Sequence, residues 1–172
     1  MSTFILILAF LAIFHFVYEG IVAPSIRMHL RNRLFSLRDE LRSLKVEGID
    51  KQDEHAFWLV HEGINHLLNR LPNLTAERRV QLEVEYEINK ELQTCVKERM
   101  AVIMNCNNKA IKDVFTRTGS VIEIAFLTNM GGWFIYILPI AFVFSSISKL
   151  SSLASELIAT PARDTNRLLP QI

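Results

Sequence analysis

A run of 25 residues without a charged side chain, Ile124 to Ser148, limits the folds open to this chain more than any other feature. A helix needs about 20 apolar residues to cross a hydrocarbon core about 30 Å thick. A second apolar run, Met1 to Ala23, opens the chain, and a charged segment of about a hundred residues separates the two. The sequence therefore predicts a membrane protein with two transmembrane helices.

The first apolar run is predicted to be an uncleaved anchor. A signal peptide begins with positive charge, and no Lys or Arg precedes this run. Four arginines follow it before the next acidic residue, Asp39: Arg27, Arg31, Arg33 and Arg38. By the positive-inside rule, the N-terminus lies outside the cytosol and the charged segment lies inside it.

Both predicted spans contain polar or helix-perturbing residues. His15 and Glu19 lie four residues apart and share a helix face. In the preferred interpretation Glu19 reaches the membrane interface or pairs with a basic neighbour there. In the alternative, His15 and Glu19 face a partner helix or a water-filled path. The second span contains Asn129, Gly131, Gly132 and Pro139. Ordinary packing between the two spans is the preferred explanation of these residues, and a self-associating, pore-lining surface is the alternative.

Two amphipathic helices are expected at the start of the cytosolic segment, after a break at Pro24-Ser25. Gly48 ends the first helix, and Pro72 follows the second. The first carries a heptad-spaced leucine stripe: Leu30, Leu34, Leu37, Leu41 and Leu44. The second carries a matching stripe: Phe57, Val60, Ile64, Leu67 and Leu71. The two stripes predict an antiparallel helical hairpin with a shared apolar interface.

A stripe of basic residues accompanies the first of these helices: Arg27, Arg31, Arg38, Arg42 and Lys45. Such a stripe next to a span is typical of a helix face that contacts solvent or anionic lipid. Nucleic acid is the less favoured partner, because Asp39, Glu40 and Glu47 dilute the stripe and the net charge is only +1.

A third helix is expected to begin after Thr75. Residues 80–88 alternate strictly between apolar and polar, which is a strand pattern. Helix is preferred because the apolar residues also recur every four positions and no partner strand is visible. The chain must return to the membrane near Ser120, so a break is predicted at Asn105 to Asn108.

Metal, cofactor and catalytic motifs are not predicted. The sequence HEGINH places His61 and His66 five apart, so the two rings point about 140° apart and cannot share a metal. Cys95 and Cys106 lie too far apart on one helix to form a disulfide. No nucleophile elbow or phosphate loop is present, and we expect no enzyme activity.

The expected fold is all-α, with two transmembrane helices flanking a cytosolic helical hairpin or bundle. The domains are residues 1–23 (first span), 24–119 (cytosolic helical domain), 120–149 (second span) and 150–172 (tail outside the cytosol). The expected location is the bacterial inner membrane, with both termini outside the cytosol.

Two functions remain open. The preferred hypothesis is a small effector that self-associates and perturbs or permeabilises the membrane under the control of its cytosolic domain. Holins and the two-span effectors of bacterial anti-phage systems are similarly small and simple in architecture, although no sequence motif links them to this chain. The alternative is a membrane-anchored scaffold whose cytosolic helices bind a partner. The expected partners are the lipid bilayer, further copies of the chain and a cytosolic regulatory protein.

Overall fold

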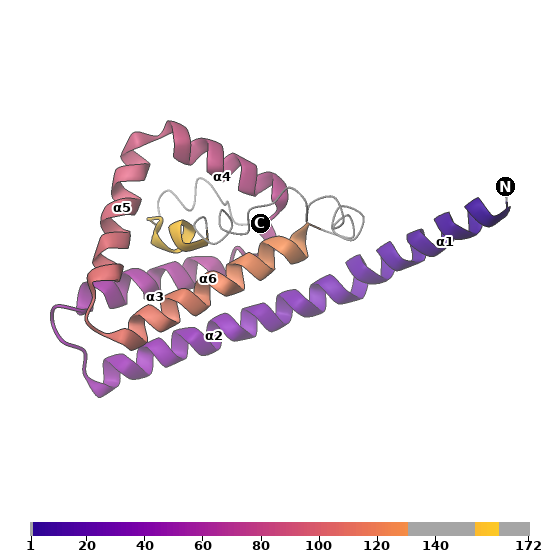
Figure 1. Ribbon diagram of the computed structural model, residues 1–172. Coiled ribbons are helices and arrows are strands. Elements are labelled where there is room, and N and C mark those ends of the chain that lie inside the picture. Colours follow the sequence, from indigo (N-terminus) through magenta and orange to yellow (C-terminus); the bar gives the residue numbers. More distant parts are fainter. Residues whose placement is uncertain (1, 131–153, 162–172) are drawn as a thin grey trace.

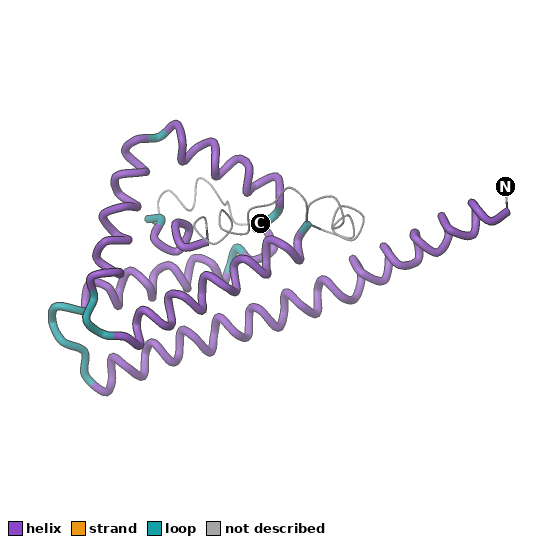
Figure 2. The backbone as a smooth tube through the Cα atoms, viewed as in Figure 1, coloured by secondary structure: helices purple, strands orange, loops and turns teal. Residues whose placement is uncertain are grey.

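The computed structural model describes residues 2–130 and 154–161. Within these residues every regular element is helical, so the predicted α class is confirmed (Figure 1). The elements are α1 (Ser2–Val17), η1 (Tyr18–Val22), α2 (Ala23–Glu47), α3 (Glu54–Leu68), η2 (Leu71–Asn73), α4 (Ala76–Ile88), α5 (Lys90–Asn105) and α6 (Lys109–Asn129). Figure 2 shows short loops between α2 and α3, between α3 and α4, between α4 and α5, and between α5 and α6.

The first three elements form one continuous helix of 46 residues, Ser2–Glu47, so the predicted break at Pro24-Ser25 is wrong. Proline lacks an N–H and its ring crowds the preceding turn. Here a π-helical turn precedes it, in which the Ala23 N–H donates to the Tyr18 carbonyl. This wider turn accommodates the proline without ending the helix. The Ser25 hydroxyl donates to the Ile21 carbonyl at 2.7 Å instead of capping a new helix.

The second half of the long helix forms one side of a helical bundle. Both α3 and α6 pack on α2, and α6 does so over the greater length. The pairs Arg117–Glu40 and Asn129–Arg27 show that α6 runs antiparallel to α2. Both predicted apolar stripes are in the core, where only Leu44 is more than marginally exposed. The core thus contains the expected α2–α3 contact together with an α2–α6 contact that the heptads did not identify.

Helices α4 and α5 form an arch over the bundle (Figure 1). Residues 80–88 belong to α4 and are helical, as preferred. The corner between the two helices is Asn89, whose side chain accepts a hydrogen bond from the Leu92 N–H at 3.0 Å. A second break lies at Cys106 to Asn108, within the predicted cluster. There the Asn108 side chain caps α6 by accepting from the Ala110 N–H at 2.9 Å.

Residues 154–161 return to the bundle and form a short helix at 154–159. The Ile158 side chain is fully buried in the main core, and Ala159 packs with Leu92 and Val96 of α5. The described part of the predicted tail, residues 154–161, therefore packs against the bundle. The placement of this tail across the membrane from domain 24–119 stays a prediction that this packing does not favour.

The second predicted span is described only at its start. Residues 120–129 are part of α6, and Val121, Ile122, Ala125 and Phe126 are buried in the bundle. Residues 131–149, including Gly131, Gly132 and Pro139, lie outside the described residues. Among the residues that are described, one helix is long and apolar enough to cross a membrane, and it is the one that begins at Ser2.

Candidate functional site

The end of α6 is attached to the long helix at the point where η1 continues into α2. The Tyr18 hydroxyl donates to the Thr128 carbonyl at 3.1 Å, and Arg27 Nη1 donates to Asn129 Oδ1 at 3.3 Å. Asn129 Nδ2 in turn donates to the carbonyls of Leu71 and Leu74 at 2.7 and 3.2 Å. The single Asn129 amide therefore joins α2, α6 and the η2 turn.

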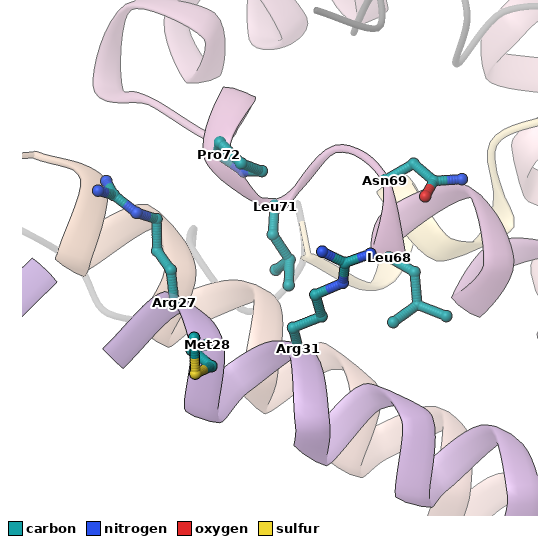
Figure 3. A pocket seen from close by; sticks show the side chains of 7 residues that line it. All are labelled: Arg27, Met28, Arg31, Leu68, Asn69, Leu71 and Pro72. Carbon is teal, nitrogen blue, oxygen red and sulfur yellow. The ribbon is translucent and has the colours of Figure 1, made fainter. Parts of the chain in front are cut away.

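A groove opens beside this junction, between α2 and η2, and we name it the α2–η2 groove. It has a volume of about 330 Å³. Its lining residues are Arg27, Met28, Arg31, Leu68, Asn69, Leu71 and Pro72. Figure 3 shows Arg27 and Arg31 rising from α2 toward η2, with the Leu71 side chain between them. The groove combines two guanidinium groups with an apolar wall.

The predicted basic stripe divides into two parts. Its distal members pair with acids: Arg38 and Arg42 both approach Asp39, and Lys45 pairs with Glu54. The hydrogen bond and charge of Lys45 lower the pKa of the Glu54 carboxyl. Its proximal members, Arg27 and Arg31, make no ion pair with any residue of the described segments. Arg31 instead lies over the Phe35 ring, 5.7 Å from its centroid.

The predicted polar pair of the first span lies in α1 and η1, and Figure 1 shows α1 extending away from the bundle. No residue of α1 or η1 is buried. His15 lies in the last turn of α1, and Glu19 lies in η1. The apolar side chains around them are largely exposed, including Phe4, Leu6 and Phe16 at 65%, 69% and 77%.

Polar residues of α3 form hydrogen-bonded networks. Glu62 accepts from Arg99 at 2.6 Å and lies 3.8 Å from His66. Arg70 Nη1 lies 3.2 Å from His66 Nδ1, and Arg42 Nε lies 3.3 Å from His61 Nε2. Across residues 2–130 and 154–161, no three His, Cys, Asp or Glu side chains are placed to bind one metal ion.

Both histidines of this network favour the neutral form. Burial lowers the pKa of His61, and the charges of Arg42 and Arg38 lower it further. Burial also lowers the pKa of His66, where Arg70 and Arg99 lower it further and Glu62 opposes them.

A polar contact fixes the loop before α6. Asp53 is buried and accepts a hydrogen bond from the Asn107 N–H at 2.9 Å, which lowers the pKa of its carboxyl. Burial raises the pKa of the neighbouring Cys106 thiol. Cys95 and Cys106 are both free thiols, and the raised pKa of Cys106 disfavours its thiolate form.

The α2–η2 groove was not identified from the sequence. Its residues come from two segments about 40 positions apart, and the Arg27–Asn129 contact joins positions 102 residues apart. The available signal was the absence of acidic residues between Arg27 and Arg38. No protein family, curated protein or solved structure matches the chain.

Proposed function

We propose that this chain is a small membrane effector, in which α1 and η1 cross the bilayer and copies self-associate through them. The helices α2 to α6 form the cytosolic bundle that controls the resulting change in permeability. The observation that carries the proposal is the unbroken helix Ser2–Glu47. A flexible linker suffices for a passive tether, whereas a continuous helix transmits a tilt or rotation of the bundle into the bilayer.

The dimensions of the exposed helix fit a membrane. Residues 2–22 form a helix about 31 Å long at 1.5 Å per residue, close to the thickness of a hydrocarbon core. Exposed apolar side chains cover this length, and a bilayer removes them from water. Signal sequences have a similar composition, but this helix continues through Ala23, which is 1% exposed, into the core of the bundle. That continuity favours an uncleaved anchor.

The orientation follows from charge. Arg27, Arg31 and Arg33 follow the apolar segment, and residues 1–23 contain no Lys or Arg. This asymmetry supports a cytosolic bundle and an N-terminus outside the cytosol, in a bacterial inner membrane.

Self-association is supported by the polar residues of the span. His15 and Glu19 share one face of a helix that is otherwise apolar over about three turns before them. Ionisable side chains inside a bilayer are costly and face protein or water. A second copy of the same helix provides such a surface.

The test is induced expression in bacteria, with membrane potential and propidium uptake followed over time. A flexible Gly-Ser-Gly-Ser insertion between Ala23 and Pro24 breaks the helical connection. The matched control carries the same insertion after Asp50, in the loop between α2 and α3. Depolarisation by the wild type and the control, lost in the junction insertion at equal membrane levels, supports the effector. Equal depolarisation by all three rules out control through the helix.

A membrane-anchored scaffold is the second candidate. It is favoured by the return of residues 154–161 to the bundle, which leaves one candidate span among the described residues. A scaffold tolerates both insertions and an inert polyleucine helix in place of α1. Silence of the wild type in the permeability assay, together with extraction-resistant membrane attachment, would favour it.

A further inference from the structure

We propose that the α2–η2 groove binds the phosphate group of an anionic phospholipid. The inference rests on the proposed function, because it takes α1 and η1 to lie in the bilayer. It adds a specific ligand site, formed by Arg27 and Arg31, to a helix that otherwise serves as anchor.

The position of the groove fits a headgroup. Arg27 and Arg31 lie four and eight residues beyond Ala23, about 6 and 12 Å along the helix axis. The headgroup layer extends about 5 to 8 Å beyond the hydrocarbon core on each side. With Ala23 at the boundary, Arg27 lies within this layer. The long side chain of Arg31 reaches back toward the layer from its outer edge.

The charge of the groove fits an anion. Among the described residues that line it there is no Asp or Glu, and Arg27 donates to a neutral amide oxygen of Asn129. Arg31 lies over the ring of Phe35 and meets no carboxylate in the described segments. Guanidinium groups match phosphate oxygens through paired, charge-assisted hydrogen bonds. The two groups lie one helical turn apart on α2, on either side of the Leu71 side chain (Figure 3).

The other residues that line the groove distinguish it from a diffuse basic surface. Met28 and Pro72 are exposed, while Leu68 and Leu71 form a buried apolar wall. Such a wall suits the glycerol backbone and the first carbons of an acyl chain. Asn69 is exposed at the rim and offers an amide donor for a headgroup hydroxyl. The volume of about 330 Å³ lies at the lower end of the range for small-molecule sites.

The experiment uses the full chain purified in a neutral detergent. Binding of dioctanoyl phosphatidylglycerol and dioctanoyl phosphatidylcholine is measured by native mass spectrometry, with and without inorganic phosphate as competitor. The variant is Arg31→Gln, and the matched control is Arg33→Gln. Arg33 is exposed on the same helix and lies outside the groove, so both changes remove one charge from α2. Thermal unfolding confirms that each variant is folded.

The expected result is a preference of the wild type for phosphatidylglycerol, reduced about tenfold by Arg31→Gln and changed less than about twofold by Arg33→Gln. Arg31→Lys keeps the positive charge but lacks the forked donors of a guanidinium group. Its loss of lipid binding is expected to lie between the losses of the two Gln variants. Equal losses in the two Gln variants, or equal binding of both lipids, would overturn the site. Displacement of the lipid by inorganic phosphate at equal concentration would indicate that the groove binds soluble phosphate, and it would contradict the lipid proposal.

The two proposals fail separately. Release of the full chain from membranes by carbonate would rule out the membrane anchor on which the proposed function depends. If the chain resists extraction but shows no lipid selectivity, only the proposal of a lipid site in the α2–η2 groove is ruled out.

Discussion

Arg27 and Asn129, 102 residues apart in the chain, meet through a hydrogen bond of 3.3 Å from Nη1 to Oδ1. The same Asn129 amide donates to the Leu71 and Leu74 carbonyls. Asn129 was expected in the second span as a polar residue that needs protein or water, and its side chain is hydrogen-bonded within the bundle. The contact fixes the end of α6 beside the proposed membrane boundary.

We expect Asn129→Ala to lower the free energy of unfolding by about 1 to 3 kcal/mol, because the carbonyls of Leu71 and Leu74 lose their donor. Chemical unfolding of the detergent-solubilised chain measures this loss. Asn32→Ala on the exposed face of α2 is the control and should change stability by less than about 0.5 kcal/mol. Equal losses in both variants would show that Asn129 does not hold the junction.

Gly63→Ala should displace residues 154–161 from the bundle. An added Cβ would lie 2.6 Å from the Ile158 carbonyl oxygen and 2.8 Å from its Cγ2 atom. The control is Gly119→Ala on α6, where the nearest atom is Ser155 Oγ at 4.0 Å. We expect Gly63→Ala to cost about 1 to 3 kcal/mol, and Gly119→Ala to be neutral or stabilising. Limited proteolysis near residue 158, faster in Gly63→Ala only, would report the displacement.

Ala12→Arg should weaken membrane attachment. Ala12 is exposed near the middle of residues 2–22, where an arginine costs about 2.5 to 3.5 kcal/mol of insertion free energy. The control is Val46→Arg, at a side chain that is 88% exposed near the far end of α2. Carbonate extraction should release the Ala12 variant and leave the Val46 variant in the pellet. Retention of both variants would contradict a span formed by α1.

The stability of the bundle should fall as the pH drops below about 6.5. Burial lowers the pKa of His61 and His66 in the folded chain, so the unfolded chain binds protons first. The stability is complete above the unfolded pKa and is lost as the pH falls toward the folded pKa. Urea unfolding at pH 7.5, 6.5 and 5.5 measures this slope. The double variant His61→Gln/His66→Gln should flatten it, and an unchanged slope would assign the dependence to other groups.

Patterns within one helix were predictable from the sequence. Heptad spacing identified the buried faces of α2 and α3, and the asparagines at 105–108 marked the break before α6. The i+4 recurrence of apolar residues identified 80–88 as helix against a strict alternation, since a lone strand leaves its backbone unpaired. These features depend on local chemistry alone.

Contacts between distant segments were not predictable in the same way. The length of the uncharged run suggested a span from residue 124, yet Ala125 and Phe126 are buried against the bundle. A fully buried helix and a transmembrane helix have the same composition, so hydropathy does not separate them. The continuation of the helix through Pro24 was missed because the π-helical turn that accommodates the proline has no clear sequence signature.

With α1 and η1 in the bilayer, as proposed, the 46-residue helix would act as a lever. The arm from Ala23 to Gly48 is about 38 Å long. A bilayer that thins makes a spanning helix tilt further. A tilt of about 10° at the membrane moves the far end of this arm by about 7 Å, which is larger than one helical turn. The loop between α2 and α3 would thus report the thickness of the bilayer as a displacement in the cytosol.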